Sequence, residues 1–194
     1  PAPGTDGRYT GVIFDCSNGN KVTMSDIGFK GNNVPGIQDT GVLLKNGCVD
    51  FRIFNNRFEN FSFAALGIDN GNYPQQRGVV FLNEFKNNYV PDSPTGITFG
   101  VGYGVQVFGN GTYPTTLELG TQNAVFVEEN NMNGNRHHIA SGNGSKYVFR
   151  NNYVTATDAT RNFAMIDAHG LTASVPVGSR SYEIYRNQIY TDVT

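Results

Sequence analysis

Apolar and polar residues alternate in short runs along this chain, and one run returns six times at loose spacing. It has the pattern apolar-x-x-Asn-x-apolar, and only its first copy lacks the asparagine. Repeats at intervals of about 20 to 50 residues are typical of a solenoid. We therefore expect each copy to belong to one turn of a stacked coil. The copies are Met24–Phe29, Ile53–Phe58, Val80–Phe85, Val127–Met132, Val148–Tyr153 and Ile184–Ile189.

A second apolar strand precedes each copy, and a turn follows it. An Asn-Gly pair forms most of these turns, and His169-Gly170 stands at the last one. Because Asn and Gly tolerate positive φ, two strands joined in this way would normally predict a β-hairpin. A hairpin gives no reason for one asparagine to recur at the same place. Stacked coils do, since equivalent residues then lie about 4.8 Å apart and can hydrogen-bond one another.

On these repeats the chain resembles the right-handed parallel β-helix superfamily, the fold of pectate lyases, polygalacturonases and phage tailspikes. The resemblance extends over roughly residues 8 to 191. It implies an all-β solenoid of about six coils with loop insertions. The right-handed sense follows from the rarity of left-handed crossovers. We expect residues 1–194 to form a single β-helix domain.

Two irregular spacings predict loop insertions. The copies that begin at Val80 and Val127 are 47 residues apart, which places an excursion within residues 86–123. A second loop is expected near residues 171–180. Insertions in solenoids project from one face, often the binding face.

Composition narrows the possible partners. Charged residues are 15% of the chain and the net charge is −2, with no basic stripe, so nucleic acid is not expected as a partner. No apolar run is long enough to span a membrane. The chain ends shortly after the last repeat without a polar cap. We therefore expect a fragment of a larger parent chain, or a homo-oligomer in which a second copy covers the ends.

The two cysteines, Cys16 and Cys48, do not occupy the same position of their repeats. A disulfide and two free thiols are both open. We favour free, buried thiols.

The candidate site lies on the last two coils. If the apolar residues of each first strand face inward, then His138, Asp167 and His169 face outward close together, with Arg136 and His137 at the strand entry. A carboxylate beside an imidazole raises its basicity, which suits a general base. We assign His138, His169 and Asp167 as candidate catalytic residues.

An acidic sugar is the expected ligand. Arginine matches a carboxylate in geometry and charge, so Arg136 and Arg180 are candidates to neutralise a uronate. Aromatic and amide side chains contact sugars. The candidate substrate-binding residues are Arg136, His137, Arg180, Tyr103 and Gln106. We expect no cofactor and no metal.

Three interpretations of this cluster stay open: a structural turn, a binding site and a catalytic site. The hydrolase signatures of the superfamily (Asn-Thr-Asp, Asp-Asp, Gly-His-Gly and Arg-Ile-Lys) are absent. The expected function is that of an extracellular or cell-surface protein that binds an acidic polysaccharide and, if the site is catalytic, cleaves it as a lyase. The alternative is a non-catalytic structural, adhesin or fibre module of a surface appendage or phage tail.

Overall fold

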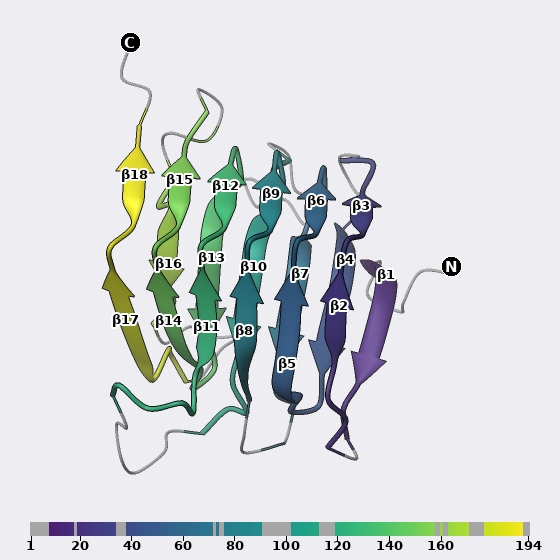
Figure 1. The fold of residues 1–194 in the computed structure, drawn as a ribbon, viewed down its shortest axis with the longest axis vertical. Helices are drawn as coiled ribbons and strands as arrows, with labels where there is room; N and C mark the ends of the chain where they lie inside the picture. Colours follow the sequence, from purple (N-terminus) through teal and green to yellow (C-terminus); the bar gives the residue numbers. More distant parts are fainter. Residues whose placement is uncertain are drawn as a thin grey trace.

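A computed structural model describes residues 8–17, 19–33, 38–71, 73, 76–90, 102–112, 119–157, 160, 163–170 and 177–191. These residues form 18 strands and no helix. The strands build three parallel sheets of six, which we call sheets A, B and C (Figure 1). Each coil contributes one strand to each sheet.

Sheet A begins every coil, and sheets B and C follow in turn. Sheet A contains β1 (Arg8–Asp15), β4 (Gln38–Lys45), β7 (Ala64–Asp69), β10 (Tyr103–Phe108), β13 (His137–Gly142) and β16 (Ile166–Ala168). Sheet B contains β2 (Thr23–Ser25), β5 (Val49–Phe54), β8 (Arg77–Phe81), β11 (Val125–Glu128), β14 (Lys146–Arg150) and β17 (Ser181–Tyr185). Sheet C contains β3 (Gly28–Lys30), β6 (Arg57–Glu59), β9 (Glu84–Lys86), β12 (Asn131–Asn133), β15 (Tyr153–Thr155) and β18 (Gln188–Tyr190).

The sheets enclose the core of a right-handed parallel β-helix. In Figure 1 sheets B and C run upward in front of sheet A, whose strands run downward, and the coils advance from right to left. The fold class predicted from the repeats is therefore confirmed, including the number of coils.

The Asn-containing run is not one strand but two, joined at a sharp corner. Two residues separate each sheet B strand from the sheet C strand that follows. The first of the two has positive φ in every coil, between 54° and 62°. This left-handed conformation turns the chain, and it is the conformation that Asn and Asp adopt at least cost. The six residues are Asp26, Asn55, Leu82, Glu129, Asn151 and Arg186.

The second corner residue forms the predicted asparagine ladder. Asn83 Oδ1 accepts hydrogen bonds from the backbone N–H of Asn56 at 2.9 Å and from its Nδ2 at 3.1 Å. Asn130 accepts the same pair of bonds from Asn83. The ladder continues through Asn152 and Asn187, so every amide of the ladder is satisfied.

The predicted position of the fifth repeat was wrong by one residue. Phe149 lies beside Val127 in the stack, and Asn152 continues the ladder. The fifth copy is therefore Phe149–Val154, one residue later than the run that begins at Val148. Two adjacent asparagines, Asn151 and Asn152, allow either alignment in sequence, and only stacking decides between them.

The extra length of the fourth coil is divided between two corners. Residues 87–102 connect β9 to β10, and residues 109–124 connect β10 to β11. The predicted insertion therefore flanks one sheet A strand on both sides. Residues 91–101 and 113–118, and most of the second predicted loop at residues 171–176, lie outside the described residues.

Cys16 and Cys48 form a disulfide, so the preference for free thiols was wrong. Cys16 follows β1 and Cys48 precedes β5, and their Cα atoms are 4.9 Å apart. The two residues need not occupy equivalent positions, because the corner between sheets A and B brings successive coils side by side. The bond ties the first coil to the second.

Replacing Leu82 with Asn is expected to stabilise the protein by about 0.5–1 kcal/mol. Leu82 has a φ of 55° and is 54% exposed, so the substitution relieves backbone strain and removes little packing. Urea unfolding midpoints measure the change. Leu119→Asn is the matched control, because Leu119 is 58% exposed and does not have positive φ. Equal midpoints for both variants would contradict the strain argument.

Candidate functional site

The outer face of sheet A carries the columns that the sequence predicted. Gln106, Ala140 and Asp167 lie side by side on β10, β13 and β16. Phe108 lies beside Gly142, and the same register brings His169 next in that column. Asp167 and His169 thus face outward on the last coil, two residues apart.

His138 does not face outward, which corrects the prediction for this residue. Its side chain is fully buried, and so is that of the next residue, Ile139. The strict in-out alternation fails here, as it does at Ala65 and Leu66 on β7, where both residues also belong to the core. Two successive inward residues occupy the start of these sheet A strands. A substrate on the outer face cannot reach the His138 imidazole.

His138 instead ends a second polar ladder at the corner between sheets C and A. Asn88 Nδ2 donates to Asn135 Oδ1 at 2.7 Å, and Asn135 Nδ2 donates to His138 Nδ1 at 2.8 Å. Burial, with the charge of His137 as a smaller cause, lowers the pKa of His138 to about 3. The residue is therefore a neutral part of the core at ordinary pH. The run Asn87-Asn88 and the pair Asn133/Asn135 were the only signs of this ladder in the sequence.

Asp167 lies beside two histidines. His169 Nε2 lies 2.7 Å from Asp167 Oδ2, and His137 Nε2 lies 3.5 Å from the same oxygen. The His169 side chain is 42% exposed, the Asp167 side chain 22% and the His137 side chain 7%. His169 is therefore the one imidazole of the three that is open to a large ligand. Its bond to Asp167 uses Nε2 and leaves Nδ1 as the second ring nitrogen.

His137 is fixed through Nδ1, which donates to the Ala164 carbonyl of the next coil, and its ring stacks on Tyr103 with centroids 5.6 Å apart. Burial lowers the pKa of His137, with Arg136 adding to the effect, while the bond to Ala164 and the charge of Asp167 oppose it. His137 therefore supports the Tyr103 ring and borders Asp167 rather than contacting solvent.

Arg136 lies in an aromatic setting beside this cluster. Its Nη1 donates to the Tyr103 hydroxyl at 3.3 Å, and its guanidinium carbon is 5.4 Å from the ring centroid of Phe163. Tyr89 packs against Phe163 at 5.5 Å. Aromatic rings hold the guanidinium in place by cation–π contact, and it makes no ion pair with any residue that the structure describes. Arg136 is thus a fixed cation near Asp167, suited to an anionic ligand.

The remaining predicted residues lie at the edges of the cluster. Gln106 is partly exposed in the column of Asp167, two coils away. Arg180 follows Ser179, whose N–H donates to the His169 carbonyl at 2.8 Å. The structure therefore brings together Tyr103, Arg136, His137, Asp167 and His169, places Gln106 and Arg180 at the margin, and excludes His138.

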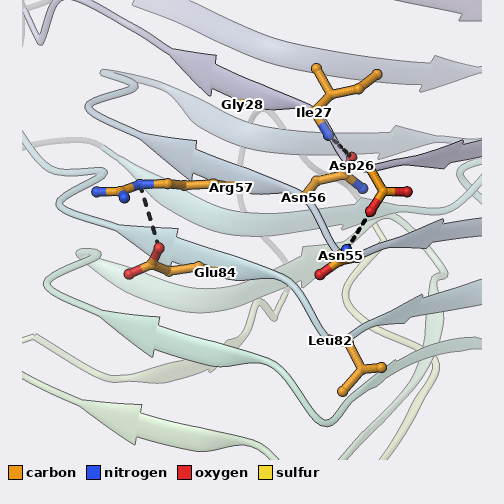
Figure 2. Close-up of a pocket in the computed structure, with 8 residues that line it drawn as sticks. All are labelled: Asp26, Ile27, Gly28, Asn55, Asn56, Arg57, Leu82 and Glu84. Carbon is orange, nitrogen blue, oxygen red and sulfur yellow. Dashed lines mark hydrogen bonds and ion pairs between the residues drawn. The ribbon is translucent and has the colours of Figure 1, made fainter.

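One shallow depression lies at the corner between sheets B and C (Figure 2). It contains the side chains of Asp26, Asn55, Arg57, Leu82 and Glu84. Its charges already have partners: Arg57 lies 3.4 Å from Glu84, and Asn55 donates to Asp26. Because two carboxylates, Asp26 and Glu84, stand there against one cation, Arg57, this depression offers little to an acidic ligand.

A second depression, which the sequence did not predict, lies on the outer face of sheet B. It is lined by Lys21, by residues of β5 and β8, and by Gln122 and Phe126. These residues come from four coils, and no short motif contains them.

No metal cluster of three or more His, Cys, Asp or Glu side chains occurs within the described residues. The same residues contain no helix that is able to cross a membrane. Neither a protein-family model, nor a curated protein, nor a solved structure matches this chain in the comparisons made.

Proposed function

We propose that this chain binds an acidic polysaccharide across the outer face of sheet A and cleaves it as a lyase. The observation that carries the proposal is the 2.7 Å bond between Asp167 and His169 on an imidazole that is 42% exposed. Asp167 holds the ring by Nε2, which leaves Nδ1 to act as the general base. Arg136 and Tyr103, on the preceding coils, supply a fixed cation and an aromatic surface next to it.

The chemistry of such a site is a β-elimination. His169 takes the proton from the carbon next to the uronate carboxylate, and Arg136 stabilises the charge that develops on that carboxylate. The electron pair of the broken C–H bond forms a carbon–carbon double bond. The bond to the leaving glycosidic oxygen breaks, and that oxygen receives a proton. Tyr103, whose hydroxyl oxygen accepts a bond from Arg136, retains an O–H and is the residue we propose as that donor.

An extracellular location belongs to the same proposal. Disulfides persist in oxidising compartments and are rare in the cytosol. The bond between Cys16 and Cys48 is buried and joins two coils, as expected of a structural disulfide. It supports export of the protein to a place where polysaccharides occur.

The expected result is that the parent protein releases unsaturated ends from polygalacturonate or alginate, and that His169→Ala slows this release about a hundredfold or more. Absorbance near 235 nm measures the double bond, and reducing ends are counted in parallel. Asp69→Asn is the matched control, since Asp69 is an exposed carboxylate in the column of His169 on β7. Circular dichroism confirms that each variant is folded.

Reducing ends without the 235 nm absorbance would replace the lyase by a hydrolase and overturn the role given to His169. Equal losses in His169→Ala and Asp69→Asn would show that the histidine has no special part.

A second candidate function is a non-catalytic structural or adhesin module. The observation that favours it is that His137 and His138 bond to neighbouring corners, through Ala164 and Asn135. In that case His169→Ala leaves every measured property of the protein unchanged. A folded parent that is inactive on all acidic and neutral glycans would favour this candidate.

A further inference from the structure

The outer face of sheet B carries a positively charged depression. Its polar wall consists of Lys21, Asp50, Arg52, Arg77 and Gln122. It lies on the side of the helix opposite sheet A, because sheet B is in front of sheet A in Figure 1. The depression and the histidine cluster are therefore separate sites on two faces.

Asp50 organises the charges of this depression. Arg77 Nε lies 2.8 Å from Asp50 Oδ1, and Lys21 Nζ lies 3.2 Å from Asp50 Oδ2. Asp50 has a φ of 54° at a register shift in β5, which directs it out of the regular strand pattern. One carboxylate thus fixes two cations.

Arg52 is the third cation of the depression, and it does not pair with Asp50. It is exposed on β5 and makes no ion pair with any residue that the structure describes. Three cations against one carboxylate give the depression a formal charge of +2 (3 − 1), whereas the whole chain carries −2. Such a local excess of positive charge attracts an anion although the protein as a whole is negatively charged.

The floor of the depression is apolar. Arg52, Val79 and Phe126 lie side by side on β5, β8 and β11. The guanidinium carbon of Arg150 lies 5.1 Å from the centroid of the Phe126 ring and so helps to hold that ring in place. The depression has a volume of about 350 Å³, near the lower end of the range for small-ligand sites. An apolar floor with a cation and an amide at its rim suits one anionic sugar unit.

We propose that this depression is a second glycan-binding site, in which Arg52 pairs with the anionic group of a sugar and Val79 and Phe126 contact its ring. The choice of a glycan as the ligand rests on the proposed function, whereas the site itself rests on the geometry of sheet B. With one site on each face, the protein anchors one stretch of an acidic polysaccharide on sheet B while sheet A engages another.

An NMR titration with tetragalacturonic acid tests this inference, because amide shifts report each face separately. We expect shifts at Arg52, Val79 and Phe126, and an affinity for sheet B that falls about tenfold in Arg52→Gln, as for loss of one charged hydrogen bond. Lys30→Gln is the matched control, since it removes the same charge from a side chain that is 70% exposed on sheet C. The fully methyl-esterified tetramer tests the need for the anion, and a sulfated oligosaccharide tests whether sulfate replaces carboxylate.

The outcomes separate the two proposals. Shifts confined to sheet A, unaltered in Arg52→Gln, would overturn the second site and leave the proposed function standing. Shifts confined to sheet B would support the second site and count against binding on sheet A. Equal binding of the methyl ester, equal weakening by Lys30→Gln, or no shift on either face would overturn the second site. Tighter binding of a thymidine oligonucleotide at Arg52 would overturn the choice of a glycan.

Discussion

Phe58→Ala is expected to lower the free energy of unfolding by about 4 kcal/mol, within the range for truncating a buried phenylalanine. Phe58 is fully buried on β6, in the middle of a stack. Its ring centroid lies 5.0 Å from that of Phe29 and 4.9 Å from that of Phe85, with nearly parallel planes. The truncation opens a cavity that neighbouring coils cannot fill, because their positions are fixed by the sheet ladders. Urea unfolding of parent and variant measures the loss.

Phe81→Ala is the matched control for this loss. Phe81 stacks on Phe54 at 5.0 Å, but on the outer face of sheet B, where both rings are partly exposed. Its removal is expected to cost about 1 kcal/mol, since stacking is lost and little area returns to water. If both variants lose the same stability, then stacking and not burial holds the coils together, and the argument for Phe58 is wrong.

Removing the disulfide is expected to lower stability by about 3–4 kcal/mol, according to the loop-entropy relation for a separation of 32 residues. The effect should be local first, because each coil of a solenoid contacts only its neighbours. The first coil has a neighbour on one side and no cap among the described residues. Hydrogen exchange in β1 and β2 should therefore accelerate on reduction well before exchange in β13 and β14 does.

The double variant Cys16→Ala/Cys48→Ala separates the disulfide from side effects of the reductant. Its unfolding midpoint should match that of the reduced parent and should not respond to added reductant. An unchanged midpoint on reduction of the parent would show that the first coil is held by packing alone.

The repeats were enough to predict the fold, because the signal that specifies it is local and recurs in every coil. The asparagine of each run, such as Asn56 or Asn130, requires an identical neighbour to satisfy its amide, and that requirement implies stacking. The outward placement of Asp167 and His169 followed from the same alternation. A single polar position, seen once, would have carried none of this information.

The errors occur where alternation fails or where contacts cross between coils. His138 was assigned outward because the sequence does not show two successive inward residues at the start of β13. The pairing of Cys16 with Cys48 depends on how two coils pass each other at a corner, which residue spacing does not reveal. The depression around Arg52 combines residues from four coils, so no stretch of sequence displays it.

The corner between sheets B and C carries a row of exposed side chains at constant spacing. Its first residue is exposed in all six coils, from Asp26 to Arg186, and shares one backbone conformation. Since the flanking strands pair in register, these side chains recur at about the strand spacing of 4.8 Å along one edge. The ladder beneath them accepts no added residue without losing its bonds. The side chains along this edge can therefore be substituted while their spacing stays fixed. Asn, Asp or Gly at these positions lowers the stability of the protein least.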